Sequence, residues 1–184
     1  LRKLFHIPWF KRSPRGLDMI HNLRRFLPHW KCDVIFDVGA NVGQSAQEFS
    51  DRLQYTQIHC FEPFPSTFEE LRSNTQKMVN VLLHPVALSS SSGHVSVNQS
   101  DCSTNNSINS TAENSTSPSQ NTVKIETRTL TEVFTELGLN RISLLKIDTE
   151  GHDLEVLHGS EEILERQAID VIHVEAGMNP TNQH

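Results

Sequence analysis

A glycine-containing turn with a carboxylate beside it is the most informative feature of the sequence. The apolar segment 34–38 runs into the turn 39–43, which reads Gly-Ala-Asn-Val-Gly. A strand, a turn and a helix in this order bring backbone N–H groups and a helix N-terminus close to a ligand. Gly39 and Gly43 permit tight turning, and Asn41 tolerates a left-handed backbone. We therefore predict a ligand-binding turn, with an ordinary strand-to-helix connection as the alternative.

Two acidic residues narrow the class of ligand. Asp37 precedes Gly39 by two residues, where its charge would repel a phosphate, and the turn does not complete the G-x-G-x-x-G pattern of a dinucleotide site. Glu62 follows the apolar segment 57–61 and lies 19 residues after Gly43. That spacing is close to the offset of roughly 20 residues at which an acid binds ribose hydroxyls. A cationic nucleoside without a phosphate suits both acids, and S-adenosyl-L-methionine is such a molecule.

A second polar cluster follows the apolar segment 143–148. If the ligand is a sulfonium such as S-adenosyl-L-methionine, transfer of its methyl group needs an in-line nucleophile, and a group that orients this nucleophile or takes its proton. Asp148 and Glu150 are the leading candidates for that catalytic role. His152 is the third, because histidine titrates near neutral pH. The alternative is that the acids stabilise the start of a helix over 153–158.

Neither a metal site nor a disulfide is predicted. Asp148, Glu150, His152 and Glu175 could together bind a divalent cation, but they form no compact ligand motif. The odd number of cysteines and their wide spacing argue against a disulfide framework or a zinc site; they are Cys32, Cys60 and Cys102. The sequence also lacks an apolar run of about 20 residues and a signal-peptide pattern, so we expect a cytoplasmic protein.

The elements that must position these residues alternate between two periodicities. Short apolar segments with strand character alternate with segments of helical spacing, which indicates βαβ units and a doubly wound, mostly parallel α/β sheet. The predicted strands are 34–38, 57–61, 81–88, 143–148 and 169–174.

Helix start signals support this order of elements. Ser66 with Glu69, and Thr129 with Glu132, have the spacing of capping boxes, and Gly138 is a stop signal for the second of these helices. Further helices are predicted over 45–53, 153–158 and 17–27. The last of these is basic and amphipathic, so it could dock across the sheet edge or lie on an anionic membrane.

The charge is unevenly distributed along the chain. The 184 residues hold 16 Lys and Arg against 22 Asp and Glu, a net charge of −6, yet residues 1–31 carry a net charge of +7. The acidic balance argues against nucleic-acid binding. We divide the chain into a basic helical lead, 1–31, and one ligand-binding domain, 32–184. Within that domain, 17 of the 25 residues in 98–122 are Ser, Thr or Asn, which predicts a polar surface insertion.

Ordered blocks of the sequence resemble the FkbM family of S-adenosylmethionine-dependent methyltransferases. The resemblance extends over roughly 33–175, and the blocks that carry it are Phe36–Gln44, Phe61–Pro63, Val86–Leu88, Leu145–Gly159 and His173–Glu175. It implies a Rossmann-like class I methyltransferase fold that uses S-adenosyl-L-methionine. It also implies O-methylation of a hydroxyl on a small molecule or glycan, such as a sugar, a glycolipid or a secondary metabolite.

The resemblance assigns cofactor roles residue by residue. It implies a loop at the methionine end of the cofactor, a ribose anchor at Glu62, and an adenine surface. The loop residues are Asp37, Gly39, Asn41 and Gly43, and the adenine surface consists of Pro63, Phe64 and Ala87.

Other readings of the sequence stay open. A class I sheet would continue beyond 169–174 into a helix and two further strands, which the remaining ten residues cannot form. The last predicted strand would then be an exposed edge, so we expect either a truncated fragment or a homodimer. A non-catalytic protein that keeps the nucleotide-binding fold is the alternative function, and an NAD-dependent oxidoreductase is a further one.

Overall fold

The computed structural model describes residues 18–98 and 122–174, which fall into two compact units divided between Lys31 and Cys32. In the first unit, helix α1 spans Met19–Phe26, and the Asp18 side chain caps it by accepting a hydrogen bond from the His21 N–H at 2.8 Å. This agrees with the helix predicted over 17–27. Contact of the basic lead with a membrane or with the sheet stays a prediction.

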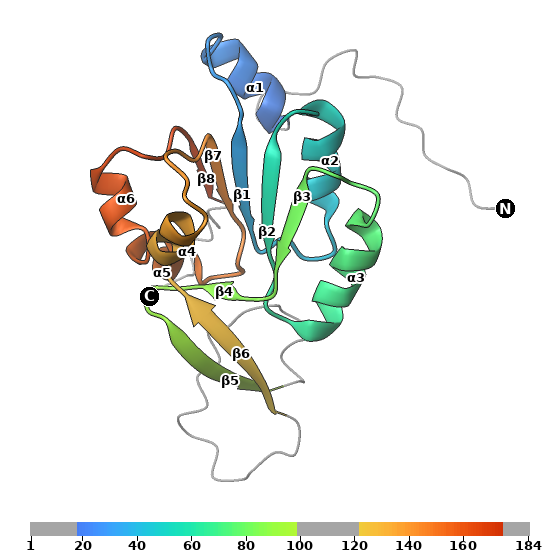
Figure 1. Ribbon diagram of the computed structural model, residues 1–184, viewed down its shortest axis with the longest axis vertical. Helices are drawn as coiled ribbons and strands as arrows, with labels where there is room; N and C mark the ends of the chain where they lie inside the picture. The colour runs from blue at the N-terminus through green and yellow to red at the C-terminus, as the bar shows by residue number, and fades with distance from the viewer. Residues whose placement is uncertain (1–17, 99–121, 175–184) are drawn as a thin grey trace, which may run out of the picture. The chain divides into compact units, whose positions relative to one another are not determined.

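The main sheet of the second unit consists of five parallel strands in the order β3-β2-β1-β7-β8 (Figure 1). The strands are β1 Val34–Val38, β2 Gln57–Phe61, β3 Val81–His84, β7 Leu144–Ile147 and β8 Ile172–Val174. The chain passes outward from β1 to β3 and then returns to the other side of β1. The predicted doubly wound α/β fold is confirmed, and its topological switch point lies between β1 and β7.

Helices pack on the main sheet (Figure 1). They are α2 Gln44–Arg52, α3 Pro65–Thr75, α4 Leu130–Glu136, α5 Asp153–His158 and α6 Glu161–Glu165. Phe134 of α4, Val156 of α5 and Ile163 of α6 share one hydrophobic core with Phe36 and Leu145 of the sheet. Because side chains alternate along a strand, the neighbours of Phe36 in β1 point to the opposite face. None of the described helices has the length and hydrophobicity of a membrane span.

A second sheet, absent from the sequence prediction, lies beyond the carboxyl ends of the main strands (Figure 1). Its strands are β4 Ala87–Leu88, β6 Thr122–Arg128 and β5 Gly93–Asn98, in that order across the sheet. β5 and β6 are antiparallel and flank residues 99–121, so most of the polar insertion, with Cys102, lies outside the described residues.

Two predicted boundaries were wrong, and proline explains both. The single strand expected over 81–88 is two strands in two sheets, because Pro85 has no N–H to donate to a ladder. Helix α3 begins at Pro65 rather than after a Ser66 cap, because the fixed φ of proline suits the first helical position. By contrast, the Thr129 cap is confirmed, since its side chain accepts a hydrogen bond from the Glu132 N–H at 3.1 Å.

The last predicted strand, 169–174, is shorter than expected. Ile169 makes only an isolated bridge to Ile142, and β8 itself begins at Ile172. Glu175 and the residues after it lie outside the described residues. The expectation of missing C-terminal strands is therefore still a prediction.

A buried histidine pair spans β2 and β3. His59 is 1% exposed, and its Nδ1 lies 2.9 Å from Nε2 of His84, while its own Nε2 has no hydrogen-bond partner within the described residues. The His84 ring also stacks on Phe61, with the ring centroids 4.6 Å apart. Burial and, to a smaller extent, the nearby His84 lower the pKa of His59 to about 4. Both rings therefore fit this core best when they are neutral.

The histidine pair predicts acid sensitivity. His59 takes up a proton near pH 6.5 in the unfolded chain but only near pH 4 in the folded protein. The contribution of neutral His59 to folding stability is therefore present above about pH 6.5 and is lost as the pH falls towards 4. We expect a change from pH 7 to pH 5 to destabilise the wild type by about 2 kcal/mol more than His59→Leu. Urea unfolding at both pH values measures this, with His94→Gln, an exposed histidine, as the control. Equal pH dependence in wild type and His59→Leu would contradict it.

Candidate active site

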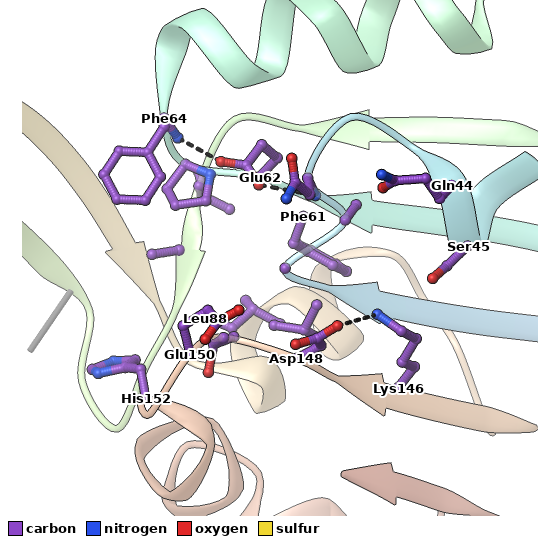
Figure 2. A pocket seen from close by; sticks show the side chains of 18 residues that line it. Gln44, Ser45, Phe61, Glu62, Phe64, Leu88, Lys146, Asp148, Glu150 and His152 are labelled. Atoms are coloured by element: carbon purple, nitrogen blue, oxygen red, sulfur yellow. Dashed lines mark hydrogen bonds and ion pairs between the residues drawn. The ribbon is translucent and has the colours of Figure 1, made fainter. Parts of the chain in front are cut away.

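A cavity of about 320 Å³ opens at the carboxyl ends of the central strands (Figure 2). It is lined by the end of β1 and its turn, the end of β2, the start of β4, and the segment that follows β7. In an open α/β sheet, the carboxyl ends of the strands beside the topological switch point are where ligands bind. The position of this cavity therefore identifies it as the candidate active site.

The turn after β1 has the left-handed backbone predicted for it. Gly39, Asn41 and Gly43 have φ values of 77°, 49° and 95°. A Cβ at Gly39 would lie 2.0 Å from the carbonyl oxygen of Asp148, so the turn touches the backbone at the end of β7. A Cβ at Gly43 would instead lie 2.9 Å from Cδ1 of Leu71 in α3. Gly39 thus shapes the cavity, whereas Gly43 permits helix packing and does not line the cavity.

Glu62 connects the end of β2 to this turn. Its side chain is buried, and its two oxygens accept hydrogen bonds from the backbone N–H groups of Asn41 and Phe64, each at 3.0 Å. Burial raises the pKa of Glu62 to about 7, although the two N–H donors act in the opposite direction. Each carboxylate oxygen can accept a further hydrogen bond. Glu62 lines the cavity, so it can bind a pair of hydroxyl groups there.

Asp37 differs from its predicted place in the cofactor loop. It is fully buried and does not line the cavity, and its Oδ1 accepts a hydrogen bond from Lys146 Nζ at 3.0 Å. The two residues are paired neighbours on β1 and β7. Burial raises the pKa of Asp37, while the Lys146 ammonium opposes the rise. Lys146, which does line the cavity, also lies 3.4 Å from Oδ2 of Asp148.

The three predicted catalytic residues all line the cavity (Figure 2). Glu150 is exposed and has a φ of 52°, which is unusual for a residue other than glycine. His152 is 9% exposed, its Nε2 lies 3.1 Å from Ser89 Oγ, and burial lowers its pKa. Asp153 accepts a hydrogen bond from the Thr149 N–H at 2.9 Å. The acids in the first turn of α5 are Asp153 and Glu155, so neither Asp148, which contacts Lys146, nor Glu150 belongs to that helix.

The residues predicted to contact the adenine lie at the cavity, together with residues that were not predicted. Pro63, Phe64 and Ala87 line the cavity as expected. Cavity residues for which the sequence analysis predicts no role include Lys146, Thr149, Gln44, Ser45, Val86 and Leu88. A signal for Lys146 existed, because a charged residue inside a buried apolar strand is costly unless it is paired. The others carry no distinctive signal in their residue type or spacing.

Comparisons with known proteins agree with this geometry. A family model described as the methyltransferase FkbM domain matches residues 37–184. Hexuronic acid methyltransferase AglP of Haloferax volcanii is 31% identical over 150 residues, covering 80% of this chain and 58% of that protein. 2-O-methyltransferase NoeI of Sinorhizobium fredii is 28% identical over 164 residues, covering 83% and 68%. The chain thus spans between about half and two thirds of the length of these relatives.

Among solved structures, precorrin-6y C5,15-methyltransferase of Geobacter metallireducens matches with a TM-score of 0.39 and 16% identity. The match covers 82% of this chain and 60% of that one.

The backbone contact at Gly39 predicts a large effect of one methyl group. We expect Gly39→Ala to lower the free energy of unfolding by at least about 3 kcal/mol, because both the left-handed backbone and the clash with Asp148 oppose a side chain. Gly138→Ala is the matched control, since Gly138 also has a left-handed backbone, with a φ of 63°, but open space around it. The control should cost only about 1–2 kcal/mol. Equal losses in urea unfolding would contradict a steric role for Gly39.

Proposed function

The chain belongs to the family of the methyltransferase FkbM domain, and we propose that it transfers a methyl group from S-adenosyl-L-methionine to a hydroxyl oxygen of a sugar-containing acceptor. The observation that carries the proposal is Glu62, a buried carboxylate that the turn holds at the cavity with acceptor capacity to spare. A carboxylate in this position suits the two hydroxyls of a ribose.

The residues around Glu62 fit the other parts of the cofactor. Phe64 and Ala87 give an apolar surface for the adenine, and Gly39 lies in the cavity wall against the Asp148 carbonyl. When bound, S-adenosyl-L-methionine supplies an electrophilic methyl group, whose transfer breaks the S–C bond, forms an O–C bond, and releases S-adenosylhomocysteine and the hydroxyl proton.

The names of the two relatives support a sugar as the acceptor. One is named for a hexuronic acid and the other for 2-O-methylation, so we propose a hydroxyl of a sugar, in a glycolipid, a glycan or a glycosylated metabolite, as the acceptor. The chain's own contribution to that step is to orient the hydroxyl and to accept its proton.

Glu150 is our leading candidate for accepting that proton. It is an exposed carboxylate at the cavity, and its left-handed backbone costs folding energy that a glycine would not. Strained residues are commonly found at functional sites. His152 is the second candidate, because burial keeps its ring neutral and Ser89 fixes its orientation.

The ionisation of Glu62 predicts how cofactor binding depends on pH. An ionised carboxylate is the better acceptor for ribose hydroxyls, and the pKa of Glu62 is about 7, so affinity should rise as the pH rises through 7. Between pH 6 and pH 8 we expect the affinity for S-adenosylhomocysteine to increase about tenfold. Calorimetric titration measures it, and Glu62→Ala should bind weakly at both pH values. The proposed function fails if the folded wild type does not bind S-adenosylhomocysteine or if NADH displaces it.

The left-handed backbone at Glu150 allows a catalytic role of this residue to be distinguished from a structural role. Glu150→Gln keeps the shape but cannot take a proton, so kcat/KM towards a methylated sugar acceptor should fall about 100-fold or more. In Glu150→Gly, kcat/KM should fall by the same factor. The free energy of unfolding should not decrease, because glycine relieves the left-handed strain. Labelled S-adenosyl-L-methionine with a panel of uronic acid and hexose glycosides gives the rates. Full activity in either variant excludes Glu150 as the base, and binding without transfer to any acceptor indicates a non-catalytic protein.

A further inference from the structure

Lys146 is a cation held at the cavity with donor capacity to spare. Its side chain is 12% exposed, and its ammonium group contacts Asp37 Oδ1 at 3.0 Å and Asp148 Oδ2 at 3.4 Å. An ammonium has three N–H donors, so these two contacts within the described residues leave one donor for a ligand. Because the group is largely removed from water, a hydrogen bond to a charged acceptor there would be strong.

The charges around Lys146 select a particular kind of ligand. Asp37 is fully buried and pairs with Lys146, so together they are close to neutral, whereas the Asp148 side chain is 35% exposed and faces the cavity. Two neighbouring carboxylates would disfavour a simple anion, and the lysine would disfavour a simple cation. A ligand with an ammonium and a carboxylate on neighbouring atoms offers a partner to both Asp148 and Lys146.

The location matches one end of the proposed cofactor. β1 lies between β2 and β7 in the sheet, so Glu62 at the end of β2 and Lys146 on β7 lie on either side of the glycine turn (Figure 2). A nucleoside bound at Glu62 would have to extend its tail across the end of β1 to reach Lys146. Gln44 and Ser45 line the same cavity at the N-terminus of α2, where the helix dipole also favours a carboxylate.

We propose that Lys146 and Asp148 form a recognition site for the amino-acid end of the cofactor, in which Lys146 binds the α-carboxylate and Asp148 binds the α-ammonium. This inference rests on the proposed use of S-adenosyl-L-methionine. Asp37 is then a positioning residue: it pairs with the Lys146 ammonium inside the protein and does not touch the ligand. The assignment gives Asp148 to the cofactor and leaves Glu150 and His152 for the acceptor hydroxyl.

Three ligands that share one nucleoside test the proposal by calorimetry. S-adenosylhomocysteine has both charged groups, its decarboxylated analogue keeps only the amine, and 5′-methylthioadenosine has neither. We expect the wild type to bind S-adenosylhomocysteine about 10- to 100-fold more tightly than the decarboxylated analogue. This comparison needs no variant, and equal affinities for these two ligands would overturn the role of Lys146.

Variants assign the effect to the side chains. The double variant Asp37→Asn/Lys146→Met removes the buried charge pair as a unit and so avoids an unpaired buried carboxylate. It should lose about 10- to 100-fold in affinity for S-adenosylhomocysteine and keep its affinity for 5′-methylthioadenosine. Asp148→Asn should weaken both amine-containing ligands and spare 5′-methylthioadenosine. Lys77→Met, at an exposed lysine outside the cavity, is the control and should change none of the three affinities.

The outcomes separate this proposal from the function on which it rests. If the double variant weakens all three ligands equally, Lys146 has only a structural role and the inference is wrong. The inference is also wrong if the double variant binds S-adenosylhomocysteine like the wild type. If the folded wild type binds neither S-adenosylhomocysteine nor 5′-methylthioadenosine, the proposed function itself fails.

Discussion

A contact between two backbone segments at the centre of the sheet is the constraint on which the site depends. Gly39 lies so close to the Asp148 carbonyl that no side chain fits between them, and the Asp148 N–H donates to the Val38 carbonyl at 3.0 Å. The turn after β1 and the segment after β7 thereby become two walls of one cavity. Because the same turn donates a hydrogen bond to Glu62 through Asn41, β2 is held in register with both of them.

The site places charged groups where burial makes them costly. Burial raises the pKa of Glu62 to about 7, so folding favours its protonated form. Its stabilising effect is complete below about pH 4.5 and is lost as the pH rises through 7, which makes the ionised carboxylate a cost to stability at alkaline pH. The Asp37–Lys146 pair is likewise buried. Buried charged groups rarely stabilise a fold more than apolar residues of similar size would. Ligand binding therefore explains the presence of Glu62 and of the Asp37–Lys146 pair better than stability does.

The second sheet completes the cavity and is joined to the main domain at Ser89. The Ser89 N–H donates to the Arg128 carbonyl, and a Cβ at Gly159 would lie 2.1 Å from the Ser89 carbonyl oxygen. Through its hydroxyl, Ser89 also contacts His152. The strands that present Ala87 to the cavity are therefore fixed against α5, and Ala87 and His152, on two parts of the cavity wall, share one anchor.

The sequence by itself determined the α/β class, the approximate positions of the main strands along the chain, the left-handed turn at Gly39 and Asn41, and the Thr129 cap, because each depends on residues a few positions apart. The break between β3 and β4 at Pro85 is also a local effect. Only the tertiary structure decided that Asp37 pairs with Lys146 and that Gly43 packs on α3. Asp37 and Lys146 are 109 residues apart, and they meet because β1 and β7 pair in one register. Which strand becomes a neighbour, and in which register, follows from packing the whole domain, so no local pattern could reveal it.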